Sequence, residues 1–310
     1  MNCRICGNSE SNTAYIGKEM MFGLRDEFDY FQCSRCECLQ IADVPDDMSR
    51  YYPEQYYSFG SYSGNKFKGF KGRFRRMKYA ALVNHQNFFH TIVRFLTGKT
   101  DYDLFQGLQV QNSTRILDVG CGNGQSFLYP LAEVGYSNIL GCDPYLEDDI
   151  SYPNGLNIKN SSIHNLSGTW DIITFHHSFE HINDPIENLK KVRQLLAPNG
   201  VCIIRIPTVS SFAWQHYKTN WVQFDAPRHF FLHSKKSMQK LAEITNLDFF
   251  KTDYDSTHFQ FSGSEMYRKD IPLSERRSVG FFNKLRYKKR ARKLNKEGNG
   301  DQAAFFFKKK

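Results

Sequence analysis

Three glycines at alternate positions mark the stretch of this chain best suited to hold a small ligand. Residues 114–124 read TRILDVGCGNG, in which a β-prone apolar run ends in Gly120, Gly122 and Gly124. A glycine has no Cβ, so the backbone can turn sharply there and approach a ligand closely. Asp118 precedes the first glycine by two residues, and its carboxylate suits a ligand that carries an ammonium group. The alternative is a glycine turn with only a folding role.

The spacing of these glycines differs from that of a dinucleotide site. The fingerprint G-x-G-x-x-G needs its third glycine one residue later, where this chain has Gln125. A second acid, Asp143, ends the apolar run NILGC and lies 25 residues after Asp118. At the tip of a second strand, this carboxylate could accept hydrogen bonds from both hydroxyls of a ribose.

Two C-x-x-C pairs near the N-terminus have the spacing of a metal site. They are Cys3 with Cys6 and Cys33 with Cys36, and 26 residues separate them. Four thiolates would close a tetrahedral shell, so we predict a structural Zn²⁺ site with no open position for chemistry. Iron could occupy the same four sulfurs, and Cys38 could replace Cys36 as a ligand. The other readings are chance spacing and a redox dithiol, which would need one C-x-x-C at the start of a helix.

Histidines follow a predicted strand and recur in a later aromatic segment. His177 and His181 come just after the strand WDIITF, and His229 follows the tetrad DAPR. A histidine is the side chain best matched to a general base near neutral pH. His229 is our first choice for that role because its aromatic loop should form the side of the site where a substrate binds. For His181 the structural reading is a residue that hydrogen-bonds the backbone where a helix begins.

Alternating strands and helices must position these residues. From residue 112 onward the pattern predicts a parallel α/β sheet, with ligands at the carboxyl ends of its strands. We divide the chain into a ribbon at 1–50, an aromatic segment with a basic helical linker or lid at 51–111, and the main domain at 112–310. The predicted strands are 115–119, 138–143, 155–159, 170–175, 201–206, 247–254 and 303–307. The predicted helices are 125–134, 185–197, 234–246 and 264–297, and a long loop is expected at 207–232.

Two stretches of unusual composition have open interpretations. Residues 51–62 hold five tyrosines and a phenylalanine, which could stack on a sugar or base or pack the ribbon onto the main domain. Residues 65–99 contain nine Lys or Arg and no Asp or Glu, with apolar residues at near-helical spacing. We expect one or two amphipathic helices there. They could meet nucleic acid or a membrane face, or could be the solvated face of a helix over the ligand cleft.

Composition is that of a soluble globular protein. The 310 residues are 40% hydrophobic and 24% charged, with a net charge of +9. No apolar run approaches the roughly 20 residues needed to span a bilayer, and the polar N-terminus lacks the apolar region of a signal peptide. We therefore expect a cytoplasmic protein. Its eight cysteines would then stay reduced, which favours a metal site over disulfides.

The chain as a whole resembles a group of bacterial class I S-adenosylmethionine (SAM) methyltransferases that carry an N-terminal zinc ribbon. Many of these are encoded with enzymes of surface-polysaccharide or deoxysugar synthesis. The matching segments are the two C-x-x-C pairs, YYPEQYYSF, ILDVGCGNG, FEHINDP, WVQFDAPRHFFLHS and GSEMYRKDIPL. The ribbon and the DAPRH segment are the most specific of these. The resemblance implies a Rossmann-like sheet of seven strands, with residues 303–307 as the seventh rather than a disordered tail.

The resemblance also implies which residues hold SAM. The methionine end would lie against Asp118 and the three glycines, and the ribose against Asp143. Many relatives have an acid near the adenine where this chain has Ser162, so a hydroxyl or the backbone must serve there. The full set of cofactor residues is Asp118, Gly120, Gly122, Gly124, Asp143, Ser162, Ile163 and His176. The catalytic candidates are His229, His181 and His177.

The acceptor class follows from a difference in length. Zinc-ribbon sugar C-methyltransferases have a further C-terminal domain, which this chain lacks, so we expect O-methylation of a glycan or a small-molecule precursor. The alternatives are an RNA methyltransferase that uses the ribbon and basic helices, and a SAM-binding scaffold without turnover. A pI near 9.0 and a net charge of +11 over residues 268–310 favour an anionic partner, such as nucleic acid or a peripheral membrane surface. Yet no aromatic-basic RNA motif is present.

Overall fold

The computed structural model describes residues 1–52, 62–83, 93, 99–275 and 278–310. Residues 53–61 of the aromatic segment and residues 84–92 and 94–98 of the basic stretch lie outside this set, so the expectations for them stay predictions. The chain forms two compact units. The first unit contains Met1–Pro53, His177–Arg193 and Ile204–Lys310, and the second unit contains Glu54–His176 and Gln194–Ile203. The domain boundaries placed after residues 50 and 111 stay predictions.

The second unit is built on parallel strands, as the alternating pattern predicts. β4 pairs in parallel with β5 and with β8, and β5 pairs in parallel with β7. All four residues of β4 are buried, which is typical of a strand covered on both faces. The strand order is β9-β8-β4-β5-β7-β6. The bounds are β4 Ile116–Val119, β5 Ile139–Cys142, β6 Ile150–Ser151, β7 Asn157–Lys159, β8 Trp170–His176 and β9 Leu196–Pro207.

Helices precede and connect these strands. The segment after the glycines forms α3, which starts at Leu128, three residues later than predicted. The basic stretch contains α1, as expected, and Phe70, Phe74 and Met77 are exposed on it. The helices are α1 Gly69–Val83, α3 Leu128–Glu133 and α4 Pro185–Leu195, with 3-10 turns at Asn65–Phe67, Asp101–Phe105 and Ile163–Asn165.

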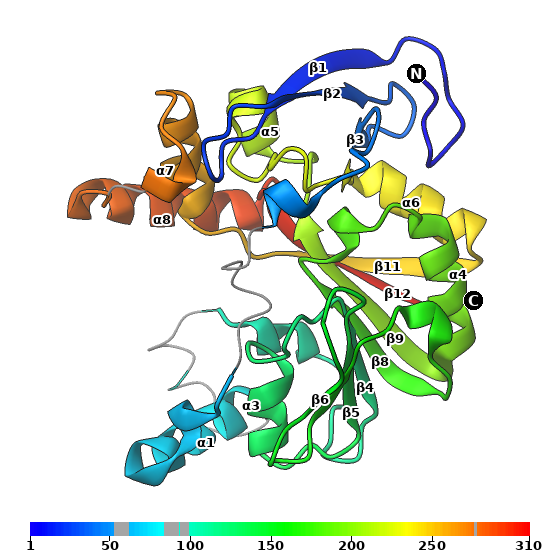
Figure 1. Cartoon of the computed structure of the whole chain (residues 1–310), viewed down its shortest axis with the longest axis vertical. Coiled ribbons are helices and arrows are strands. Elements are labelled where there is room, and N and C mark those ends of the chain that lie inside the picture. The colour runs from blue at the N-terminus through cyan, green and yellow to red at the C-terminus, as the bar shows by residue number, and fades with distance from the viewer. Residues whose placement is uncertain (53–61, 84–92, 94–98, 276–277) are drawn as a thin grey trace. The chain divides into compact units, whose positions relative to one another are not determined.

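The first unit contains an antiparallel sheet made from two distant parts of the sequence. β1 and β2 run side by side as a ribbon (Figure 1) over six paired residues. β3 pairs with β2 and also with the two-residue strand β10, so the order is β1-β2-β3-β10. The cysteine-bearing N-terminus is therefore fixed to the segment after DAPRH. The bounds are β1 Thr13–Lys18, β2 Glu27–Gln32, β3 Leu39–Ile41 and β10 Phe231–Leu232.

The rest of the first unit closes with an antiparallel pair of strands. β11 pairs with β12, and the strand order there is β11-β12-β9. Residues 303–307 lie within β12 and are buried, while Lys308 is exposed. The C-terminal FFFKKK is therefore a strand with a charged end, as the resemblance implies. The bounds are α5 Phe212–Tyr217, α6 Lys235–Ile244, β11 Leu247–Tyr254, α7 Phe259–Tyr267, α8 Phe281–Lys296 and β12 Gln302–Lys309.

Three expectations need correction. The sheet that contains β9 has eight described strands rather than the predicted seven. The additional strand is β6, which has two residues and runs antiparallel to β7. The region 207–232 is not a plain loop, because Ser211 caps α5 by accepting a hydrogen bond from the Trp214 amide. The region 264–297, predicted to be helical, belongs to two separate helices, since α7 ends at Tyr267 and α8 begins at Phe281. Pro272 lies between them, and proline disfavours a continuous helix.

Candidate functional site

The glycine turn has a conformation that requires glycine. Gly120, Gly122 and Gly124 have φ values of 69°, 56° and 69°, in the left-handed region that other residues rarely adopt. Space is also restricted at the third position, where an added Cβ would lie 2.7 Å from Cδ1 of Ile158. The turn therefore depends on glycine for both its backbone shape and its packing.

Asp143 is tied directly to this turn. It follows the last residue of β5 and is buried, with 5% of its surface exposed. One carboxylate oxygen accepts a hydrogen bond from the Gly122 amide at 2.8 Å, and the other accepts one from the Tyr145 amide at 3.0 Å. Asp143 therefore fixes the glycine turn through the Gly122 amide.

Asp118 is buried in β4 beside Thr174 of β8. The Thr174 hydroxyl donates to the Asp118 carboxylate at 2.7 Å. Burial raises the pKa of Asp118 to about 8, although the hydrogen bond from Thr174 acts in the opposite direction. A buried carboxyl of this kind would gain from a cation placed beside it. Sequence reasoning missed Thr174, because a threonine inside an apolar strand gives no signal of this pairing.

The remaining predicted cofactor residues follow other strands of the second unit. His176 is the last residue of β8, and its ring lies 4.2 Å from that of Phe127. Ser162 is half-buried and Ile163 is buried, and both follow β7. All eight predicted cofactor residues thus belong to the second unit, and each lies in or shortly after one of four parallel strands. Their contacts with SAM stay a prediction.

The first unit brings the three predicted catalytic histidines around a buried carboxylate. Glu180 has no exposed surface. Its Oε1 lies 3.5 Å from Nδ1 of His177 and 3.9 Å from Nε2 of His229, and the rings of His181 and His229 are 4.8 Å apart. We call these four residues the histidine–carboxylate cluster. The histidines were predicted from the sequence and Glu180 was not, although it stands between His177 and His181 in the segment HSFEH.

Charge in this cluster follows from burial and from neighbours. Burial alone would raise the pKa of Glu180, but the nearby imidazoles of His177, His181 and His229 lower it below its usual value. Burial lowers the pKa of His229 to about 4, against the attraction of Asp225. At neutral pH the cluster therefore contains an ionised carboxylate and a neutral His229. His177 has a φ of 52°, and such strain often marks functional sites.

The DAPRH segment has a structural role alongside His229. Arg228 is fully buried and binds both oxygens of Asp225 through Nε, at 3.1 and 3.0 Å. Its Nη2 donates to the Glu19 carboxylate at 2.8 Å, and its Nη1 donates to the Tyr51 carbonyl at 3.2 Å. Arg228 thus fixes the loop that presents His229 rather than facing an acceptor itself.

The four predicted zinc ligands lie together in the first unit. The Sγ atoms of Cys3 and Cys36 are 3.5 Å apart, as are those of Cys6 and Cys33, and all four lie within 4.8 Å of one another. Sulfurs around Zn²⁺ at the usual bond length of about 2.3 Å lie roughly 3.8 Å apart, so the arrangement fits. Cys38 is not in this group, because its Sγ lies 3.8 Å from Nδ1 of His233.

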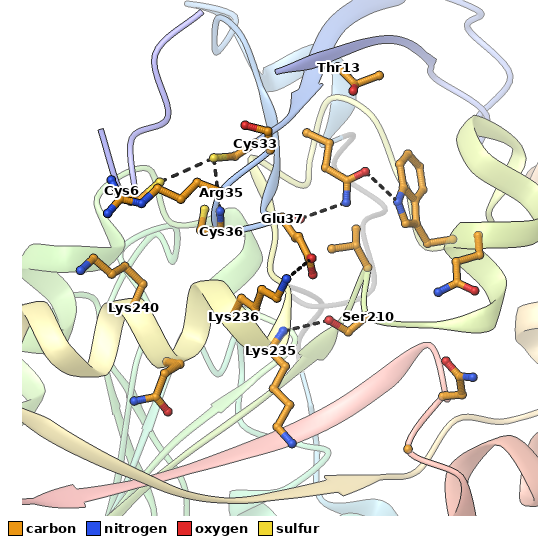
Figure 2. Close-up of a pocket in the computed structure, with 18 of the residues that line it drawn as sticks. Cys6, Thr13, Cys33, Arg35, Cys36, Glu37, Ser210, Lys235, Lys236 and Lys240 are labelled. Atoms are coloured by element: carbon orange, nitrogen blue, oxygen red, sulfur yellow. Dashed lines mark hydrogen bonds and ion pairs between the residues drawn. The ribbon is translucent and has the colours of Figure 1, made fainter. Parts of the chain in front are cut away.

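A cavity of about 1140 Å³ opens beside these cysteines. Figure 2 shows Cys6, Cys33 and Cys36 on one side, with lysines of α6 opposite them. Two of these lysines are paired with carboxylates, since Lys236 contacts Glu37 and Lys240 contacts Glu243. The pairing reduces the positive charge that an anionic partner would meet.

None of the described helices is both long and apolar enough to cross a membrane.

Comparisons with known proteins point to one reaction class. The family model described as "Methyltransferase domain" matches residues 73–251, more than half of the chain. A comparison with curated protein sequences gave no match.

Solved structures of methyltransferases resemble the chain at low identity. A possible histamine N-methyltransferase from Thermotoga maritima is 17% identical, with 75% of this chain and all of that chain covered and a TM-score of 0.44. A SAM-dependent methyltransferase from Mesorhizobium loti is 14% identical over 68% and 99% of the two chains, with a TM-score of 0.44. A cyclopropane synthase from Mycobacterium tuberculosis is 14% identical over 66% and 81%, with a TM-score of 0.42. The family match carries the assignment: the chain belongs to the methyltransferase-domain family and is a SAM-dependent methyltransferase.

Proposed function

We propose that this enzyme transfers the methyl group of SAM to a sugar hydroxyl in a glycan or its small-molecule precursor. The observation that carries the proposal is the histidine–carboxylate cluster, which starts at His177, one residue after the last predicted cofactor residue. A hydroxyl must lose its proton as the new O–C bond forms, and a neutral imidazole can take it. The sugar as acceptor is supported by the resemblance in the ribbon and DAPRH segments.

SAM would bind in the second unit. Gly120, Gly122 and Gly124 would admit the methionine end, Asp118 would meet its ammonium, and Asp143 would accept hydrogen bonds from the ribose hydroxyls. Ser162 and Ile163 would border the adenine, and His176 would lie near the sulfonium. SAM supplies an activated methyl group, so the protein mainly has to align the acceptor with the C–S bond and exclude water.

Isotope tracing tests the acceptor class. Purified enzyme and methyl-labelled SAM would be incubated with an extract from cells that lack this gene, and the label would then be fractionated. Label in glycan or nucleotide-sugar fractions, unaffected by ribonuclease, is expected. Label lost on ribonuclease treatment would make the enzyme an RNA methyltransferase, with the basic helices α1 and α8 as its binding surface. SAM binding without transfer would favour a scaffold.

SAM binding should release a proton from Asp118. In the folded protein without SAM, the Asp118 carboxyl has a pKa of about 8, so it is mostly protonated at pH 6.5. The ammonium of SAM favours its ionised form. SAM affinity should therefore rise with pH, by up to about tenfold per unit below pH 8. The pH dependence of folding stability that this group causes in the absence of SAM has the opposite sign. The folded state keeps this proton between about pH 4 and 8 while the unfolded chain loses it, so this group lowers stability as pH rises.

Calorimetry in two buffers of different ionisation enthalpy measures that proton. At pH 6.5 the wild type should give buffer-dependent binding heats, and Asp118→Asn should give equal heats in both buffers. Equal heats for the wild type would contradict the predicted contact between Asp118 and the ammonium.

We further propose that Cys3, Cys6, Cys33 and Cys36 hold one structural Zn²⁺, which would join the N-terminus to the turn before β3 and supply no chemistry.

Cys36→Ser should lower the zinc content well below one per chain and reduce the melting temperature. Cys38→Ser is the matched control, because its Sγ points away to His233, and it should keep its zinc. Metal analysis of both variants decides between the two cysteines. Zinc loss only in Cys38→Ser would reverse the assignment.

A further inference from the structure

Glu180 places a carboxylate in a fully buried position. Its side chain has no exposed surface, and neither oxygen has a hydrogen-bond partner among the residues that the structure describes. The nearest imidazole nitrogens are Nδ1 of His177, 3.5 Å from Oε1 of Glu180, and Nε2 of His229, 3.9 Å from the same oxygen. Both distances are longer than an ordinary hydrogen bond. An ionised carboxylate left in this state is costly, and buried charges are normally paired or bound to a metal ion. The position therefore calls for a cation.

Two neighbouring histidines are held in the form that binds metals. Nδ1 of His181 lies 2.7 Å from the Arg228 carbonyl, and Nδ1 of His229 lies 2.9 Å from the Gln223 carbonyl. A carbonyl can only accept a hydrogen bond, so each Nδ1 carries the proton and each Nε2 has a free lone pair. Metal-ligating histidines typically donate their other N–H to a backbone carbonyl in this way.

We propose that Glu180, His181 and His229 bind a divalent metal ion. One ligand atom from each lies within 4.8 Å of the other two. Donor atoms about 2.1 Å from an ion in tetrahedral geometry are roughly 3.4 Å apart, so small side-chain rotations would bring these three donors to that spacing. Two histidines and one carboxylate leave coordination positions open for a substrate. The donor set favours Mn²⁺, Fe²⁺, Co²⁺ or Zn²⁺ and differs from the four thiolates of the cysteine site.

This site deepens the proposed function and rests on it for its chemistry. A metal ion with open positions can take two adjacent sugar oxygens and lower the pKa of a bound hydroxyl. The hydroxyl proton passes to His177, whose side chain is 33% exposed. The oxygen then forms its bond to the methyl carbon as the C–S bond breaks, and the electron pair stays on sulfur in S-adenosylhomocysteine. The substrate class is a sugar with vicinal oxygens.

Mn²⁺ is the most selective probe because it prefers nitrogen and oxygen ligands over thiolates. Full-length enzyme with zinc in its cysteine site would be titrated with Mn²⁺, and free Mn²⁺ would be measured by electron paramagnetic resonance. We expect one Mn²⁺ per chain. Glu180→Gln should bind at least about tenfold more weakly, because loss of an outer-shell partner alone often costs that much. Glu147→Gln, the same change at an exposed acid, should bind as the wild type does.

Two further variants separate metal binding from folding and from catalysis. Retained zinc in Glu180→Gln would show that its first unit is folded, and His229→Gln removes a ligand without touching the carboxylate. His177→Gln should keep Mn²⁺ binding and lose methyl transfer. Wild-type Mn²⁺ affinity in Glu180→Gln and His229→Gln, or no Mn²⁺ bound by the wild type, would overturn the proposal. Mn²⁺ binding without transfer to any sugar would instead refute the proposed function and leave the metal site standing.

Discussion

Arg228→Ala is expected to destabilise the first unit by about 3–5 kcal/mol, the usual cost of breaking a buried ion pair by removing one partner. The guanidinium is fully buried between two carboxylates, with contacts of 2.8 Å to Glu19 and 2.6 Å to Asp225. Burial would raise the pKa of Asp225, but Arg228 keeps it below its usual value. Without the arginine, two negative charges would face each other in a site with little water.

Denaturant unfolding measures this effect, with Arg50→Ala as the matched control. Arg50 pairs with Asp26 at 3.0 Å, but its side chain is 60% exposed, and exposed pairs contribute under about 1 kcal/mol. The loss of stability in Arg228→Lys should lie between those of the two alanine variants, because an ammonium cannot replace the bidentate contact with Asp225. A loss below about 1 kcal/mol for Arg228→Ala would mean that this network does not hold the loop.

Asp143→Ala is expected to weaken SAM binding by at least about 100-fold. Charge-assisted hydrogen bonds contribute about 1.5–3 kcal/mol each, so losing two to the ribose corresponds to two or more factors of ten. The structure adds a second reason, because the same carboxylate accepts a hydrogen bond from the Gly122 amide at 2.8 Å. This bond fixes the turn that would admit the methionine end.

Calorimetric titration with SAM measures the loss, and circular dichroism checks the fold. Asp148→Ala is a suitable control, because Asp148 follows in the same loop and is exposed. It should bind SAM as the wild type does. An unchanged affinity in Asp143→Ala would remove the ribose contact from this account.

The sequence was informative where one local signal fixes one structure. Gly120, Gly122 and Gly124 all adopt the left-handed backbone that only glycine adopts easily, so their spacing alone located the turn. The run 303–307 is buried in β12 as expected, although its composition also suits a tail. The strand predicted at 247–254 has the bounds of β11.

The features that sequence reasoning missed depend on partners far along the chain. β10 has only two residues, too few for a periodic signal, and it exists because β3 pairs with it from almost two hundred residues away. Arg228 and Glu19 have the composition of surface residues, yet they bury each other at a sequence separation of 209. Glu180 is similar, because its burial among histidines depends on where the His229 loop packs.

The position of the new methyl group on the acceptor tests directly whether the enzyme methylates a sugar hydroxyl. Enzyme would be supplied with SAM carrying a ¹³C-methyl group and with nucleotide-linked or glycan sugars, and the product would be examined by NMR. We expect the label to appear as a methoxy carbon on a sugar ring that bears a neighbouring oxygen. Label bonded to carbon or nitrogen, or found only in nucleic acid, would contradict it.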